Sequence, residues 1–213
     1  MNPMDKSPEP TPAISRQPAQ ELGPRALRTI ANILDATRDV FLTSGYVGTT
    51  IDEIAKGADI SRASFYTYFP SKKEVLVAIG EHAARESATL FDRLGTAGST
   101  RVGMRKWVSD YFEFLDVHGS FAFAWTQGAV DDEEIRTAGM KRHLKLCKKF
   151  GDALAATAGK NRDDAQQLGL VMTSTLERSW SYCQVYGDAI DVTDIKHHVA
   201  DVMWDAARAK PKA

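Results

Sequence analysis

Residues 45–73 constrain this chain more than any other segment, because they contain two short helical patterns separated by a tight turn. Thr50 and Glu53 predict a capping box at the start of the first helix, in which each side chain accepts a hydrogen bond from the other residue's backbone N–H. Ser61 is a good N-cap for the second helix. That helix ends at Phe69, because the following proline disfavours helical backbone before it. The segment therefore predicts two short helices that meet at a steep angle.

The second of these helices carries different side chains on its two faces. Phe65 and Phe69 are expected to point inward, while Arg62, Ser64 and Thr67 point outward. An arginine can bind guanine through two hydrogen bonds, and short hydroxyl side chains adapt to several bases. In a helix-turn-helix, the first helix rests on the phosphates and the second enters the major groove. In a plain helical hairpin, the run of aromatic residues that follows Ser61-Arg62-Ala63-Ser64 would face water on at least one side. The pattern therefore favours DNA recognition.

The stretch TTIDEIAKGADISRASFYTYFPSKKEVL is similar to the N-terminal helix-turn-helix of the tetracycline-repressor (TetR) family, over about residues 26–80. The matching elements are Gly45, Thr50, Ile54, Ala55, Ala58, Phe65, Tyr66, Phe69, Ser71 and Lys72. The resemblance implies an all-α homodimer with DNA-reading heads, a helical ligand-binding core, and repression that ends when a small molecule binds. By carry-over, it implies DNA contacts from Thr50, Arg62, Ala63, Ser64, Tyr66, Thr67, Tyr68 and Lys72. Asp52 departs from members that place a basic residue there, and it is expected to complement the helix dipole.

The rest of the chain also has helical periodicity, and no segment shows sustained strand alternation, so the predicted fold is all-α. Six of the eight prolines lie in residues 1–24, so residues 1–22 are predicted to be a flexible arm. The DNA-binding domain is expected at residues 23–72, the effector-binding and dimerisation domain at 73–208, and a tail at 209–213. Ser71 and Glu74 predict another capping box, and His118-Gly119 is expected to separate two helices.

Aromatic side chains are dense between residues 101 and 186, which fits a deep apolar pocket for a hydrophobic or aromatic effector. Core packing alone explains any single one of them, so both interpretations stay open. The candidate ligand-binding residues are Trp107, Phe114, Trp125, Met172 and Trp180.

By analogy with the family, the last two long helices are expected to form the dimer surface. The candidate residues are Leu168, Met172, Leu176, Val199, Met203 and Trp204. Packing within one chain is the alternative for each. DNA recognition also favours a dimer, because one short helix buries too little surface to select a site within a genome. The expected operator is therefore a palindrome in double-stranded DNA.

Other classes of protein receive little support from the sequence. The net charge of -1 means that any DNA affinity must come from local basic side chains. Cys147 and Cys183 are too few for a disulfide framework or a zinc site, which favours a reduced, cytoplasmic compartment without a metal or cofactor. No apolar run is long enough for a membrane span, and no paired acid–base constellation indicates an enzyme. The alternative function is a helical protein that binds small molecules without sequence-specific DNA binding.

Overall fold

The structure is a computed structural model that describes residues 23–209. The arm predicted for residues 1–22, and the predicted tail apart from Ala209, lie outside this range. The described residues contain no strand, which confirms the all-α prediction. In chain order the elements are α1 (Pro24–Gly48), α2 (Ile51–Gly57), α3 (Arg62–Tyr68), α4 (Lys72–Ala97), α5 (Arg101–Asp131), α6 (Glu133–Ala156), α7 (Ala165–Tyr186), the short 3-10 helix η3 (Gly187–Ala189) and α8 (Val192–Arg208). None of these helices is both long enough and apolar enough to cross a membrane.

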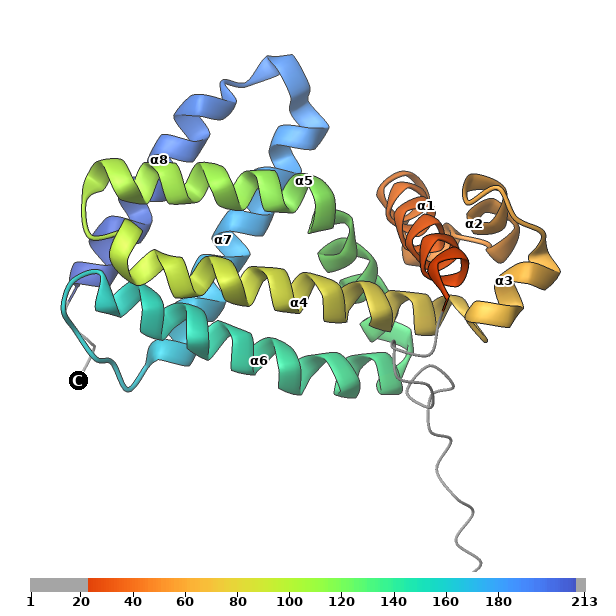
Figure 1. Cartoon of the computed structure of the whole chain (residues 1–213). Helices are drawn as coiled ribbons and strands as arrows, with labels where there is room; N and C mark the ends of the chain where they lie inside the picture. Colours follow the sequence, from red (N-terminus) through yellow and green to blue (C-terminus); the bar gives the residue numbers. More distant parts are fainter. Residues whose placement is uncertain (1–22, 210–213) are drawn as a thin grey trace, which may run out of the picture.

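The helices are arranged as a small head and a larger body. Figure 1 shows α1, α2 and α3 gathered at one end, while α4 leaves this head and runs lengthwise beside α5 and α6. Helix α7 crosses these three, and α8 packs against α5, α6 and α7. A single helix, α4, therefore extends from the head through the body.

Two hydrophobic clusters hold the head and the body together. The head cluster contains Phe41, Phe65 and Leu76, but it also includes Ala124 from α5 and Ile135 from α6. The body cluster contains stacked aromatic rings from three helices, among them Phe91, Trp107 and Phe150. Helix α4 supplies side chains to both clusters, so a displacement in the body can reach the head through packed side chains.

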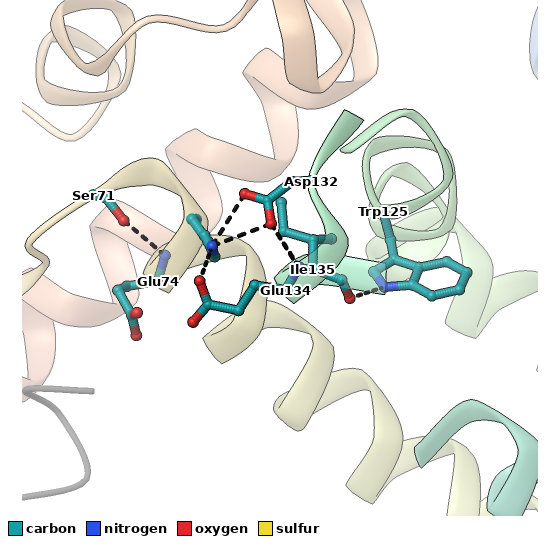
Figure 2. A network of polar contacts seen from close by, with 7 residues as sticks. Ser71, Glu74, Trp125, Asp132, Glu134 and Ile135 are labelled. Atoms are coloured by element: carbon teal, nitrogen blue, oxygen red, sulfur yellow. Dashed lines mark hydrogen bonds and ion pairs between the residues drawn. The ribbon is translucent and has the colours of Figure 1, made fainter. Parts of the chain in front are cut away.

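Local capping signals set where the short helices begin. The predicted capping box is present, since Thr50 Oγ1 accepts from the Glu53 N–H and Glu53 accepts from the Thr50 N–H at 2.8 Å. Ser61 Oγ caps α3 by accepting from the Ser64 N–H at 3.0 Å. At the start of α4, Ser71 accepts from the Glu74 N–H, and this half of the predicted box is visible in Figure 2.

The break predicted at His118-Gly119 is wrong, because α5 runs unbroken from Arg101 to Asp131. Gly119 is buried within that helix. A Cβ at this position would lie 2.2 Å from the Trp180 ring of α7. The glycine is therefore explained by the close approach of two helices and not by a chain turn.

Candidate nucleic-acid interface and ligand cavity

The turn between α2 and α3 is tight because small residues line it. A Cβ on Gly57 would lie 3.1 Å from Ala36 Cβ, so α2 packs closely on α1. Asp59 adopts a φ of 54°, a left-handed conformation that aspartate tolerates better than most residues. The Ile60 N–H then donates to the Ala55 carbonyl at 3.0 Å. This local geometry fixes the angle at which α3 projects from the head.

Helix α3 presents a polar face away from the core, as predicted. Phe65 is fully buried, as is Phe69 just after the helix. The residues predicted to contact DNA are exposed or half-buried: Thr50, Arg62, Ala63, Tyr66 and Thr67 are exposed, and Ser64 and Tyr68 are half-buried. The face that they form is available to a large partner.

Arg62 is held in place by two neighbours on this exposed face. Its guanidinium donates to Asp52 Oδ2 at 2.6 Å and to the Tyr66 hydroxyl at 3.3 Å. Asp52 thus has a specific partner on α3 in addition to its place in the first turn of α2. An exposed ion pair of this kind is weak in water, so Arg62 can exchange Asp52 for a base or a phosphate.

Lys72 occupies a different position from the other predicted DNA contacts. Its ammonium donates to the backbone carbonyls of Tyr46 at 2.6 Å and Thr49 at 2.8 Å, and it lies 4.6 Å from the centre of the Tyr46 ring. Burial lowers the pKa of Lys72, with Glu53 acting in the opposite direction. In this conformation Lys72 ties the end of α1 to the start of α4, and its donors are directed at the protein.

Residues 33–79, which contain this helix-turn-helix, match the family model described as bacterial regulatory proteins, tetR family. The chain belongs to the TetR family. The match covers the head from Ile33 of α1 onward and the first turns of α4.

The curated relatives that this TetR-family chain resembles are named as transcriptional regulators. It is 32% identical over 134 residues to the uncharacterized HTH-type transcriptional regulator YuxN of Bacillus subtilis, covering 62% of this chain and 46% of YuxN. It is 28% identical to EthR of Mycolicibacterium smegmatis over 50% of each chain. The chain thus spans about half the length of these two relatives. The crystal structure of the TetR-family regulator PfmR from Thermus thermophilus superposes with a TM-score of 0.63 at 17% identity, covering 81% of this chain and 97% of PfmR, which shows a shared fold.

The body of this TetR-family chain contains a cavity of about 290 Å³ between α4, α5, α6 and α7. That volume lies near the lower end of the usual range for small-molecule sites. Aromatic side chains form much of its wall: Phe91, Tyr111, Phe114, Phe121 and Trp125. The polar side chains of the lining come from all four helices: Ser87, His118, Thr126, Arg142, His143, Thr173, Ser174 and Glu177.

The predicted ligand-binding residues divide into two groups in the structure. Phe114 and Trp125 line the cavity. Trp107 is buried in the body cluster, where its indole N–H donates to the Leu90 carbonyl at 2.9 Å. Met172 is buried in the same cluster. Trp180 donates to Asp116 at 2.8 Å and lines a second, smaller hollow. These three side chains do not line the main cavity.

Sequence reasoning missed the titratable groups of the cavity, because they come from three helices and form no motif. His118 is buried, and its Nε2 lies 2.9 Å from Glu86 Oε2, while its Nδ1 is buried without a hydrogen-bond partner among the described residues. Burial lowers the pKa of His118, although the Glu86 carboxylate opposes this. Burial alone raises the pKa of the Glu177 carboxyl to about 7.

The structure also brings together three residues for which the sequence indicated no common site. His82 Nδ1 lies 2.9 Å from Glu86 Oε1, and Glu86 also pairs with His118. The ligand atoms of these three side chains lie within 4.8 Å of one another, an arrangement that could hold a metal ion. As they stand, the Glu86 carboxylate lies 2.9 Å from a ring nitrogen of each imidazole.

Most of the residues predicted for the dimer surface are buried inside this chain. Met172, Leu176, Val199 and Met203 belong to the body cluster, and Leu168 and Trp204 pack against it while partly buried. Within one chain these four side chains are covered by the body's own core, while Leu168 and Trp204 remain partly accessible, and the dimer surface on these two helices stays a prediction. The strongest apolar stripe of an amphipathic helix faces its own core first.

A polar network at the junction of head and body was also missed. Lys73, in the first turn of α4, donates to both carboxylate oxygens of Asp132 and to Glu134. Asp132 also caps α6 by accepting from the Ile135 N–H at 3.0 Å. The Ile135 carbonyl in turn accepts from the Trp125 indole N–H at 3.3 Å, and Figure 2 shows this series of contacts. Because Trp125 lines the cavity, these bonds connect the cavity wall to the base of the head.

Proposed function

We propose that this protein is a ligand-responsive, DNA-binding transcriptional regulator that acts in the cytoplasm, and that it is a repressor which leaves its operator when a small molecule enters the cavity. One observation carries the proposal. The exposed polar face of α3 is connected to the wall of a largely apolar cavity through α4, Lys73, Asp132 and Trp125. The names of the relatives, which are transcriptional regulators, support the same conclusion.

Within this proposal the residues of α3 have separate tasks. Arg62, Ser64 and Thr67 read base edges, and Ala63 allows the close approach that they need. Thr50, Tyr66 and Tyr68 position the head by binding phosphates through hydroxyl or backbone groups. Lys72 supports them from behind, because its ammonium is directed at backbone carbonyls of the head. A direct contact between Lys72 and a phosphate would require these two hydrogen bonds to break first.

The DNA-binding unit is proposed to be a homodimer whose surface includes the outer face of α7. Val171, Tyr182 and Val185 lie on one side of this helix and are exposed by 56%, 46% and 72%. Arg178 lies on the same side, with its guanidinium 5.6 Å from the Tyr182 ring centre. A face that combines apolar, aromatic and arginine side chains has the composition of protein–protein interfaces.

A paired charge substitution on this face is expected to separate the subunits. The double variant Val171→Asp, Val185→Asp should weaken dimerisation by about 100-fold, because it buries charges without partners at the centre of the interface. Sedimentation velocity over a concentration series measures this directly. The variant Val102→Asp places the same charge on an exposed valine of α5 and serves as the control. A wild-type chain that stays monomeric at high concentration would contradict the proposal.

Signal transmission is proposed to run from the cavity wall to α4. A ligand that displaces Trp125 strains its bond to the Ile135 carbonyl, next to the Asp132 cap that holds Lys73. A second connection lies nearby, because the Tyr46 N–H of α1 donates to Gln127 of α5 at 2.7 Å. Both connections end at the base of the head. A shift in either one changes how the head is oriented on the body.

A substitution in the cavity wall is expected to imitate the ligand. A Cβ on Gly139 would lie 2.1 Å from Trp125 Nε1, so Gly139→Ala forces this indole to move. Operator affinity should fall about tenfold, within the usual range of allosteric coupling. In a Lys73→Ala background the fall should be smaller, because one connection to α4 is already lost. Fluorescence anisotropy with labelled operator measures both. Unchanged affinity in folded Gly139→Ala protein would contradict this route.

The proposed function is tested by selecting bound sequences from random double-stranded DNA. A regulator of this kind should enrich a palindrome whose half-sites are about one helical turn apart. A sequence-blind binder would bind DNA in a salt-dependent way without enriching any sequence. If no sequence is enriched while small molecules still bind the cavity, the alternative function of a small-molecule-binding helical protein is correct.

A further inference from the structure

The cavity contains a carboxyl group that no residue described by the structure neutralises. Glu177 projects from α7 into the cavity, and no described residue donates a hydrogen bond or forms an ion pair with its carboxyl. Arg142 is the one arginine or lysine in the cavity lining, and it pairs with Glu81 at 3.1 Å. A half-buried carboxyl group without a partner is costly, so Glu177 is a candidate for contact with a bound ligand.

The other polar groups of the wall do not supply the missing positive charge. Beside Glu177, the titratable side chains that face the cavity are Tyr111 and His118 on α5, and Arg142, His143 and Cys147 on α6. Burial lowers the pKa of both His118 and His143, which keeps their imidazoles neutral near pH 7. The cavity-lining residues of α4 carry no titratable side chain. Glu177 therefore faces neutral or already paired groups on every side.

A second group in the wall also lacks a donor. With Nε2 of His118 bonded to Glu86, its buried Nδ1 has no partner among the described residues and is an acceptor in the neutral ring. The same cavity wall contains the rings of Phe114, Phe121 and Trp125, and the Phe114 ring centre lies 4.6 Å from that of His118. Aromatic faces attract cations as well as apolar bodies. A ligand that satisfies the Glu177 carboxyl and His118 Nδ1 must therefore supply hydrogen-bond donors, and a positive charge would suit both the carboxylate and the aromatic faces.

We infer that the effector is a small cationic amphiphile, with an apolar body packed against the aromatic wall and a protonated amine bound by Glu177. This inference rests on the proposed ligand-binding function and adds the chemical class of the ligand. A carboxylic acid of the same shape would meet an unpaired carboxyl and be rejected. A neutral alcohol would fill the apolar space but leave Glu177 without its charge partner.

The test compares three probes with the same phenylbutyl body: 4-phenylbutylamine, 4-phenylbutanol and 4-phenylbutanoate. Titration calorimetry of the full chain at pH 8 should show the amine binding at least about tenfold more tightly than the alcohol, and the acid most weakly, because only the amine forms a charge-assisted bond. Glu177→Gln keeps the shape and should abolish the preference while leaving alcohol affinity within about twofold. Glu113→Gln, which changes an exposed carboxyl of α5, should behave like the wild type.

The dependence on pH provides a second readout. Binding of the ammonium requires an ionised Glu177, so below its pKa of about 7 binding releases one proton and weakens. Amine affinity should therefore rise about tenfold between pH 6 and pH 8 in the wild type, and should stay flat in folded Glu177→Gln protein. The alcohol should show no such rise.

The outcomes separate this inference from the function on which it rests. If the alcohol binds as tightly as the amine, or if the preference survives in Glu177→Gln, the cationic class is wrong while the cavity remains a ligand site. Preference for 4-phenylbutanoate overturns the inference in the same way. If none of the three binds at millimolar concentration, both the inference and the ligand-responsive part of the proposed function are wrong.

Discussion

Replacing Arg62 with alanine is expected to lower affinity for the selected operator about 100-fold or more. A bidentate contact between arginine and guanine is among the strongest sources of base discrimination, and a two-fold dimer loses it twice. The side chain lies on the exposed face of α3, where Asp52 and Tyr66 are its hydrogen-bond partners among residues 23–209. Its removal should therefore leave folding intact. Anisotropy titrations with the operator and with scrambled DNA measure the loss of affinity and of specificity.

Two further variants show whether charge or geometry explains the loss. Arg62→Lys keeps the charge but cannot form the two-pronged contact, so it should retain non-specific binding and lose discrimination. Arg93→Ala removes the same charge from an exposed position on α4 in the body and should leave operator affinity unchanged. If Arg62→Ala binds the operator within twofold of the wild type, α3 is not reading DNA through this residue.

Replacing Gly169 with alanine is expected to be among the most destabilising single-methyl changes in the body. A Cβ at Gly169 of α7 would lie 1.8 Å from the Cys147 carbonyl oxygen of α6, and one at Gly151 would lie equally close to the Ala165 carbonyl. Backbone atoms cannot move aside as a flexible side chain can. The two helices must separate, which should cost more than about 4 kcal/mol, a large part of the stability of a typical domain.

Gly95→Ala is the matched control for this prediction. A Cβ at this position of α4 would lie 3.9 Å from Ala156 Cβ of α6, which is an ordinary van der Waals contact. Alanine is favoured over glycine in a helix by about 0.5–1 kcal/mol, so this variant should be slightly more stable than the wild type. Urea unfolding followed by circular dichroism measures both variants. A loss of less than about 1 kcal/mol for Gly169→Ala would contradict the close backbone contact.

The head was predictable because its signals are local. The Thr50–Glu53 box, the Ser61 cap and the inward positions of Phe65 and Phe69 each depend on residues close in sequence. Capping needs only the right side chain within the first turn, so a linear sequence is enough to recognise it. The helical character of the rest followed from periodicity in the same way.

The body was less predictable because its features depend on which helices meet. Periodicity located the apolar stripe through Met172 and Leu176, but it could not show that the chain's own core covers that stripe. Gly119 was interpreted as a break, because its partner Trp180 is distant in sequence. Glu177 carried no signal at all, since an acidic residue on a helix is ordinary until three other helices enclose it.

The position of Lys72 has a consequence for how an operator can be designed. Its hydrogen bonds to the Tyr46 and Thr49 carbonyls connect the junction of α1 and α2 to the first turn of α4. We therefore expect the head to move as a rigid body. Under the proposed function, ligand binding would then alter the distance between two unchanged reading heads, and each head would keep its preferred bases. Synthetic operators can share one half-site sequence and differ in the length of the spacer between the half-sites. The ligand-free and ligand-bound forms of the protein should prefer different spacers. A longer or a shorter spacer should therefore still bind the ligand-bound form, which the natural site releases.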